Sequence, residues 1–229
     1  MKLILIANLA GGVGKTALTQ GIATAASEYG KRALAIDATF DGALTFLSGV
    51  ENPRFTLLEC ATDPGKLETA VTKTADRYSL LPGASRVSGL AKIPASFKDA
   101  LQDFDLVVVD SASGPNRVLP LLIEITDRII SPIDGAMVSF RGALHLRRFI
   151  ERATTKPKID LVLNAKRSET ALEFAREEFV ILEPEVRSDV EVAKSQLGTR
   201  SALSESATCD FASDVRELTY ALLEDFAMI

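Results

Sequence analysis

Six consecutive residues near the start of the chain have the composition of a phosphate-binding loop: Gly11, Gly12, Val13, Gly14, Lys15 and Thr16. Glycines tolerate positive φ, so they bring the backbone close to a polyphosphate and turn its N–H groups inward. The lysine would then reach the β- and γ-phosphates, and the threonine hydroxyl would ligate Mg²⁺. These residues and Ala17 therefore predict a nucleotide site; the alternative is a glycine turn with a solvated lysine.

Acidic residues at the ends of apolar runs are the candidate metal ligands. Asp110 follows four apolar residues that begin at Leu106, and Asp37 closes the run Ala33–Ile36. Ligands of open α/β sheets bind outside the carboxyl ends of the strands, which is where such residues would lie. Without a phosphate loop, Asp110 would be interpreted as a turn residue that caps a core strand.

Short β-branched or Leu-rich runs alternate with segments of helical period, a pattern typical of an α/β fold with a mostly parallel twisted sheet and helices on both faces. We expect strands at Lys2–Ala7, Arg32–Asp37, Tyr78–Leu81, Leu106–Asp110, Arg128–Ser131, Ile159–Leu163 and Phe179–Leu182. We expect helices at Lys15–Tyr29, Ala95–Gln102, Asn116–Ile125, Ala136–Ala153, Glu169–Glu178, Asp189–Leu197 and Asp210–Phe226. The stretch Pro82–Pro94 is predicted to be a long surface loop.

The composition excludes several classes of protein. The chain has 229 residues, a formal net charge of −5 and 47% hydrophobic residues, so it is too apolar for disorder and suits one domain, residues 1–229. Apolar runs are too short to span a membrane, and the first of them is interpreted as a strand and not as a leader. Cys60 and Cys209 stand alone. They predict neither disulfides nor a metal cluster, in keeping with a reducing cytoplasm.

The loop departs from the usual phosphate-loop pattern, because Leu9 stands where the first glycine is expected. The segment from Asn8 to Thr16 instead resembles the compressed loop of the deviant Walker group, the ParA/MinD family of positioning ATPases. The resemblance continues along the chain at Ala35-Ile36-Asp37-Ala38-Thr39-Phe40-Asp41-Gly42, Phe104–Ser111, Thr126–Ile133, Leu161-Val162-Leu163-Asn164 and Val186-Arg187.

The resemblance implies roles for individual residues. ATP with Mg²⁺ would bind at the loop, with Lys15 as a catalytic group. Thr16, Asp110 and Asp37 would hold the metal, Asp110 through water. Asp37 would also support catalysis, and Asn164 would contact the adenine, unless it only ends its strand. The family further implies a homodimer that forms on ATP binding.

Two family residues are missing. Ala10 occupies the position of a signature lysine that reaches the partner's phosphates, and Thr39 replaces an aspartate that aligns the attacking water. Phosphoryl transfer depends on positioning and electrostatics, so we expect weak or atypical hydrolysis. Asp41 is a candidate substitute carboxylate, or only a turn residue. Arg141 is a candidate replacement cation. The missing lysine also resembles the McdA branch, which positions carboxysomes.

Basic residues cluster on one predicted helix. Arg141, His145, Arg148 and Arg152 recur at helical spacing, and the segment Arg141–Lys158 has a net charge of +5. This stripe could contact DNA phosphates without sequence preference, although a solvated basic face is an equally good interpretation. Arg187 and Lys194 form a second candidate patch for DNA or a partner. The acidic terminal helix from Asp210 would be repelled by anionic lipid, so no membrane docking is expected.

The sequence favours a ParA-like positioning or partition ATPase, cytoplasmic and associated with the nucleoid. Its Mg-ATP dimer would bind nonspecific DNA, and a ParB-like or McdB-like adaptor would stimulate hydrolysis. Alternatives are an McdA-like carboxysome-positioning ATPase and a degenerate module that binds ATP with little hydrolysis. A ligase of the dethiobiotin or cobyrinic acid type is disfavoured, because no glutaminase Cys-His pair is evident.

Overall fold

A computed structural model describes all residues, 1–229. One eight-stranded sheet runs through the molecule in the order β3-β4-β2-β5-β1-β6-β7-β8, and only the β3–β4 pairing is antiparallel. The strands are β1 (Lys2–Ile6), β2 (Ala33–Ala38), β3 (Thr72–Lys73), β4 (Ser79–Leu81), β5 (Leu106–Ser111), β6 (Arg128–Ile133), β7 (Lys158–Asn164) and β8 (Ile181–Val186).

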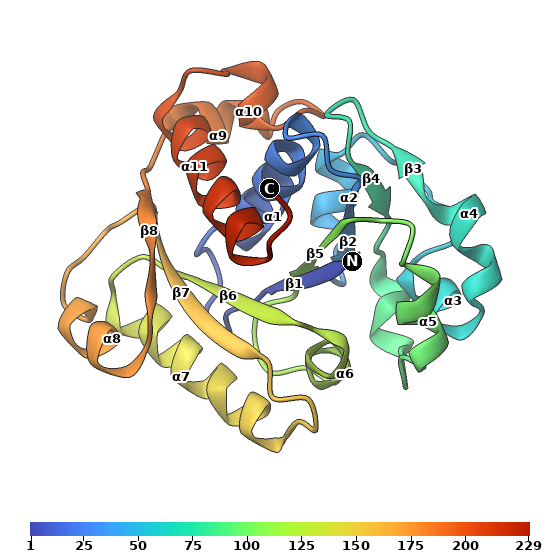
Figure 1. Cartoon of the computed structure of the whole chain (residues 1–229), viewed down its shortest axis with the longest axis horizontal. Coiled ribbons are helices and arrows are strands. Elements are labelled where there is room, and N and C mark those ends of the chain that lie inside the picture. The colour runs from blue at the N-terminus through green and yellow to red at the C-terminus, as the bar shows by residue number, and fades with distance from the viewer.

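Helices cover both faces of this sheet (Figure 1). They are α1 (Lys15–Glu28), α2 (Ala43–Leu47), α3 (Leu57–Thr62), α4 (Leu67–Ala70), α5 (Ala95–Ala100), α6 (Val118–Ile125), α7 (Met137–Arg152), α8 (Leu172–Glu178), α9 (Val190–Ser195), α10 (Ala202–Glu205) and α11 (Asp210–Asp225), with 3-10 turns at Pro64–Lys66 and Ser85–Gly89. None of these helices has the length and apolar character that a membrane span requires.

Alternation along the central strand β1 divides the core in two, because successive side chains point to opposite faces. Leu3 and Leu5 pack with the core under α3, α5 and α6. Ile4 and Ile6 pack on the other face, with α1, α10 and α11. All four are fully buried, so the strand that leads into the phosphate loop is fixed from both sides.

The topology places a crevice at the end of β1. This strand pairs with β5 on one side and β6 on the other, both parallel, and the chain order reverses there. Such a switch point leaves space between the loops that follow the strands, which is where open α/β sheets bind ligands.

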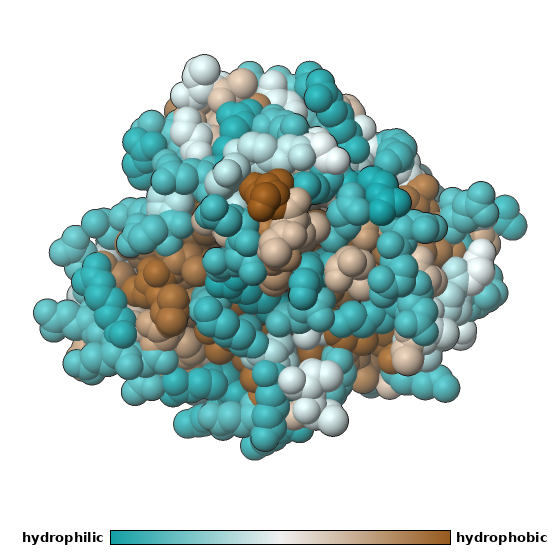
Figure 2. Space-filling model, in the orientation of Figure 1, coloured by the Kyte–Doolittle hydropathy of each residue, from teal (hydrophilic) through white to brown (hydrophobic).

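The α/β fold with a mostly parallel sheet is confirmed, and each of the seven expected strands and seven expected helices is present within a few residues. The predicted surface loop at Pro82–Pro94 is present, with a 3-10 turn at Ser85–Gly89, but it is only partly on the surface. Pro82 and Gly83 are buried, and Val87 and Leu90 enter the core from the 3-10 turn at Ser85–Gly89. The visible face is mostly hydrophilic, with an apolar patch beside β8 (Figure 2). Phe174 on α8 and Val180 just before β8 are among the exposed large apolar residues.

Candidate nucleotide-binding site

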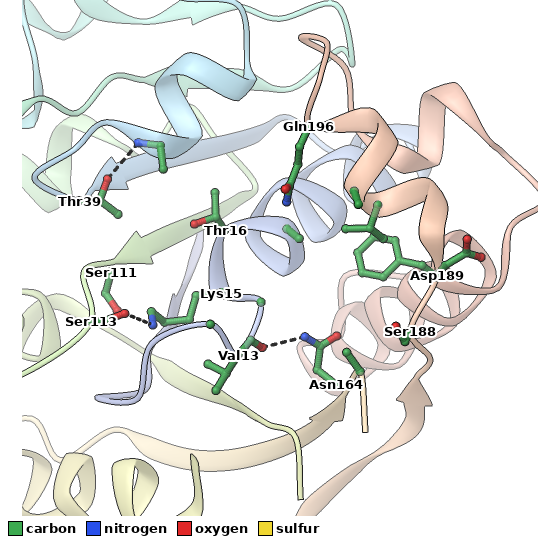
Figure 3. Close-up of a pocket in the computed structure, with 18 of the residues that line it drawn as sticks. Val13, Lys15, Thr16, Thr39, Ser111, Ser113, Asn164, Ser188, Asp189 and Gln196 are labelled. Carbon is green, nitrogen blue, oxygen red and sulfur yellow. Dashed lines mark hydrogen bonds between the residues drawn. The ribbon is translucent and has the colours of Figure 1, made fainter. Parts of the chain in front are cut away.

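A cavity of about 670 Å³ opens at the carboxyl end of the sheet (Figure 3). Residues from distant parts of the chain line it: Gly12, Val13, Gly14, Lys15, Thr16, Ala17, Thr39, Asp41, Ser111, Ser113, Asn164, Arg167, Arg187 and Gln196 are among them. Of the predicted loop residues only Gly11 lies outside this lining, and it faces the side chain of Ser113. The size of the cavity is suitable for a nucleotide.

The phosphate loop depends on two glycines with positive φ, Gly12 at 72° and Gly14 at 84°. Gly14 also has no room for a side chain, since a Cβ there would lie 2.2 Å from the amide nitrogen of Asn164. The following helix, α1, has no side-chain N-cap. Its first backbone N–H groups and its dipole are therefore available to an anion.

Lys15 is held at the start of α1 by two acceptors. Its ammonium donates to the carbonyl oxygen of Ala10 at 3.0 Å and to the hydroxyl of Ser113 at 2.7 Å. Burial lowers the pKa of Lys15, and the negative charge of Asp110 opposes that effect. A buried ammonium with two neutral partners is well placed to bind a phosphate, which supplies the counter-charge that the loop lacks.

Asp110 meets a structural test for a metal site. It is fully buried at the end of β5, and neither carboxylate oxygen has a hydrogen-bond partner. Burial raises its pKa to about 8, with a further contribution from Asp37, while Thr16 and Lys15 act in the opposite direction. An orphaned carboxylate beside a threonine hydroxyl is a suitable donor set for Mg²⁺, which prefers oxygen ligands and retains several waters.

Asp37 is held by hydrogen bonds within the loop that follows β2. Its carboxylate is fully buried and accepts hydrogen bonds from the backbone N–H and hydroxyl of both Thr39 (2.9 and 2.6 Å) and Thr45 (2.8 and 2.7 Å). Like Asp110, it does not line the cavity itself. These bonds engage both oxygens, so Asp37 anchors the loop between β2 and α2, and its roles in metal binding and catalysis stay predictions.

Thr39 and Asp41, which lie in that loop, differ in how far their side chains are engaged. The Thr39 hydroxyl donates to Asp37 and accepts a bond from Ala43, so it is engaged within the loop. Asp41 is exposed at the cavity, where its carboxylate accepts only a 3.3 Å bond from the backbone of Ala43. Asp41 is therefore the loop carboxylate that remains available to a ligand.

Asn164, at the end of β7, touches the phosphate loop directly. Its side-chain amide donates to the carbonyl oxygen of Val13 at 2.8 Å (Figure 3). Sequence reasoning missed several other lining residues, and Ser113, Arg167 and Gln196 are three of the polar ones. The spacing of Ser113 from Asp110 was the only signal that could have indicated the first, because the other two lie in loops that the sheet topology brings together.

The predicted basic residues fall into two groups. Arg141, His145, Arg148 and Arg152 are exposed along α7 and line a second hollow of about 460 Å³, together with Leu9, Ala10, Pro115, Val138 and Phe149. We call this hollow the α7 groove. Arg187 and Lys194 lie elsewhere and are paired, with Asp214 at 2.7 Å and Glu191, respectively. The structure thus leaves the first group, and not the second, with uncompensated charge.

The fold and this site define a nucleotide-binding protein of the P-loop class. The family model of the CobQ/CobB/MinD/ParA nucleotide binding domain matches residues 4–207, so the chain belongs to that family. An uncharacterized ATP-binding protein of Methanocaldococcus jannaschii is 30% identical over 168 residues, 71% of this chain and 64% of that protein. The chromosome-partitioning ATPase Soj of Thermus thermophilus is 27% identical over 169 residues, which are 69% of this chain and 66% of that protein. The matches span slightly less than two thirds of both relatives.

Solved structures support the same fold. The cell division ATPase MinD of Pyrococcus furiosus superposes with a TM-score of 0.82 at 20% identity, covering 97% of this chain and 98% of its own. Cobyrinic acid a,c-diamide synthase of Mycobacterium smegmatis gives 0.81 at 22% identity over 99% and 95%. Apo McdA of Cyanothece gives 0.79 at 22% identity over 97% and 99%. The expected ParA/MinD-type P-loop ATPase fold is confirmed.

Proposed function

We propose that this chain is a ParA-like positioning or partition ATPase that binds Mg-ATP at the cavity. The observation that carries this proposal is the orphaned carboxylate of Asp110 beside Lys15 and Thr16 on the phosphate loop. Magnesium would supply charge neutralisation of the phosphates. The related MinD of Pyrococcus horikoshii is complexed with Mg-ADP, and the Mycobacterium synthase with an ATP analogue and magnesium, which supports this choice of ligand.

Each polar residue of the site has its own role in binding the nucleotide. Lys15 exchanges its bonds to Ala10 and Ser113 for the phosphates, and the first N–H groups of α1 orient them. Thr16 and Asp110 would hold the metal. Asn164 keeps the loop in place through Val13 and would contact the adenine. Asp41 is the candidate group for positioning the attacking water.

ATP binding would favour a homodimer. In this family a lysine reaches across to the partner's phosphates, but Ala10 cannot do so. Arg141 lines the same groove as Ala10, is exposed and forms no ion pair, so it is our candidate for the replacement cation. The dimer would bind nonspecific DNA through the remaining unpaired cations of α7, Arg148 and Arg152, at the nucleoid in the cytoplasm. A ParB-like or McdB-like adaptor would stimulate hydrolysis and release.

The test combines size-exclusion chromatography with gel-shift assays on duplex DNA. We expect Mg-ATP, but not ADP, to produce a dimer that shifts duplex DNA and releases it as salt rises. Lys15→Ala should abolish both effects. If Mg-ATP changes neither the oligomeric state nor DNA binding of the wild-type chain, the positioning function fails.

A degenerate module that binds ATP with little turnover is the second candidate. It is favoured by the Thr39 hydroxyl, which is committed to Asp37 and leaves no aspartate at the family's water-aligning position. Phosphate release measured with and without DNA separates the two candidates. Turnover that disappears in Lys15→Ala favours the ATPase, and no turnover despite tight ATP binding favours the degenerate module. An McdA-like role would differ in cargo, not in this chemistry.

A further inference from the structure

The α7 groove carries charge that nothing in the molecule compensates. Arg147, on the same helix but off the stripe, pairs with Glu178 at 2.9 Å and lies over the ring of Phe179. Arg141, His145, Arg148 and Arg152, by contrast, have no carboxylate within ion-pair distance, in a chain with 31 acidic and 26 basic residues. This contrast indicates a surface that attracts an anionic ligand.

The walls of the groove are apolar. Leu9 and Pro115 contribute to them from the loops after β1 and β5, and Val138, which is 74% exposed, and Phe149 contribute from α7. The phosphates of a DNA backbone, which would face the cations, offer no apolar surface to cover these side chains. A peptide that alternates carboxylates with aliphatic side chains would pair with the cations and bury the apolar walls at the same time.

The length of the groove and its positive electrostatic field also favour a short ligand. From Arg141 to Arg152 the helix rises about 16 Å, which is the span of three helical turns. A long polyanion extends beyond this stretch and meets the rest of a chain with a net charge of −5. A short segment experiences mainly the local positive field, because screening removes more distant charges beyond about 8 Å at physiological salt.

We propose that the α7 groove docks an acidic, partly apolar peptide segment of a partner protein. This docking site rests on the proposed function in one respect: DNA is the ligand with which the peptide competes. Because the segment and the DNA phosphates need the same cations, docking of the partner displaces DNA from α7. Release from the nucleoid is thereby coupled to recruitment of the partner through simple competition for one surface.

The experiment uses the full chain and fluorescence anisotropy with two labelled probes: a dodecapeptide of glutamate and leucine, and a short duplex DNA. We expect Arg148→Ala to weaken peptide binding about fivefold, the loss of one charge-assisted contact. The matched control is Arg147→Ala, which removes the same charge from the same helix and leaves peptide affinity unchanged. Val138→Ser should weaken the peptide but not the duplex. Thermal melts verify that the variants are folded.

Three results would overturn the docking site: no peptide binding, an equal loss in Arg147→Ala and Arg148→Ala, or no effect of Val138→Ser on the peptide. An equal loss in the two arginine variants would mean that the peptide responds only to the net charge of the helix. If the duplex binds while the peptide does not, this inference fails and the proposed DNA binding stands. If the peptide binds as expected and no duplex binds, the DNA part of the proposed function fails and the docking site stands.

Discussion

The ammonium of Lys15 donates a hydrogen bond to the carbonyl oxygen of Ala10 at 3.0 Å, five residues earlier in the same loop. Ala10 also lines the α7 groove, and its backbone N–H donates to the side chain of Asn8. One residue thus belongs both to the surface beside α7 and to the first contact shell of the phosphate-binding lysine. A change at the groove can reach the nucleotide site across a single peptide unit.

Removal of the Lys15 ammonium should weaken nucleotide binding without unfolding the protein. Lys15→Ala deletes a charge-assisted phosphate contact, worth about 1.5–3 kcal/mol, so affinity for ATP should fall about 10- to 150-fold. Stability without nucleotide should change little, because the buried ammonium has only neutral hydrogen-bond partners. Titration with a fluorescent ATP analogue measures the loss. Lys92→Ala, at an exposed position, is the control, and equal affinities for the two variants would contradict the assignment.

Replacement of Asp110 should separate stability from metal binding. Both of its oxygens are buried without partners, so Asp110→Asn should stabilise the nucleotide-free protein. A gain of about 1–2 kcal/mol corresponds to a melting temperature roughly 2–8 °C higher for a chain of this size. The same variant should lose the extra thermal stabilisation that Mg²⁺ adds to ATP. Differential scanning fluorimetry measures both effects, on the protein alone and with ATP in the presence of either EDTA or Mg²⁺. If the nucleotide-free variant melts at a lower temperature than the wild type, the buried carboxylate of Asp110 is not destabilising.

Gly142 on α7 should prove intolerant of a side chain. A Cβ at this position would lie 2.0 Å from Oδ1 of Asn8, the oxygen that accepts the hydrogen bond from Ala10. Gly142→Ala should therefore cost about 1–3 kcal/mol of stability and weaken ATP binding by displacing the phosphate loop. Gly89→Ala, where the nearest atom would be an ordinary 3.8 Å away, serves as the control. If ATP affinity survives in Gly142→Ala, the helix and the loop are not mechanically coupled.

The pair Arg187–Asp214 should make stability depend on acid pH. Burial alone would raise the pKa of Asp214, but hydrogen bonds from the Arg187 guanidinium and backbone N–H, at 2.7–2.9 Å, outweigh it and hold the pKa below its ordinary value. The folded protein then binds fewer protons than the unfolded chain, so the contribution is present above about pH 4 and is lost as pH falls through the lowered pKa.

Arg187→Gln should lower the melting temperature by a few degrees at neutral pH, and its difference from the wild type should shrink on acidification. Lys194→Gln, which breaks an exposed pair with Glu191, should leave stability unchanged at both neutral and acid pH. Thermal melts across the acid range provide the comparison. A difference for Arg187→Gln that stays constant with pH would mean that Asp214 is not the titrating group.

Much of the fold was predictable because periodicity reports burial on each strand and helix. The phosphate loop was predictable as well, since its residue types and their strand-to-helix context are contiguous in the chain. The hydrogen bonds of Asp37 to Thr45 were not, because they depend on how the chain turns into α2. Likewise, the sequence places Arg148 and Arg187 in two similar basic patches. Only the three-dimensional pairing with Asp214 shows that the second is neutralised.

The position of β1 has a consequence for biosynthesis. Residues 4–6 pair with both Val108–Asp110 and Arg128–Ile130, so the strand lies at the centre of the sheet although it leaves the ribosome before either partner strand. At about 5–20 residues per second, its last partner follows roughly 6–25 s later. During that interval an apolar β-strand has both edges unpaired. Early chaperone contact at Leu3–Ile6 would protect the nascent chain until the sheet closes around it.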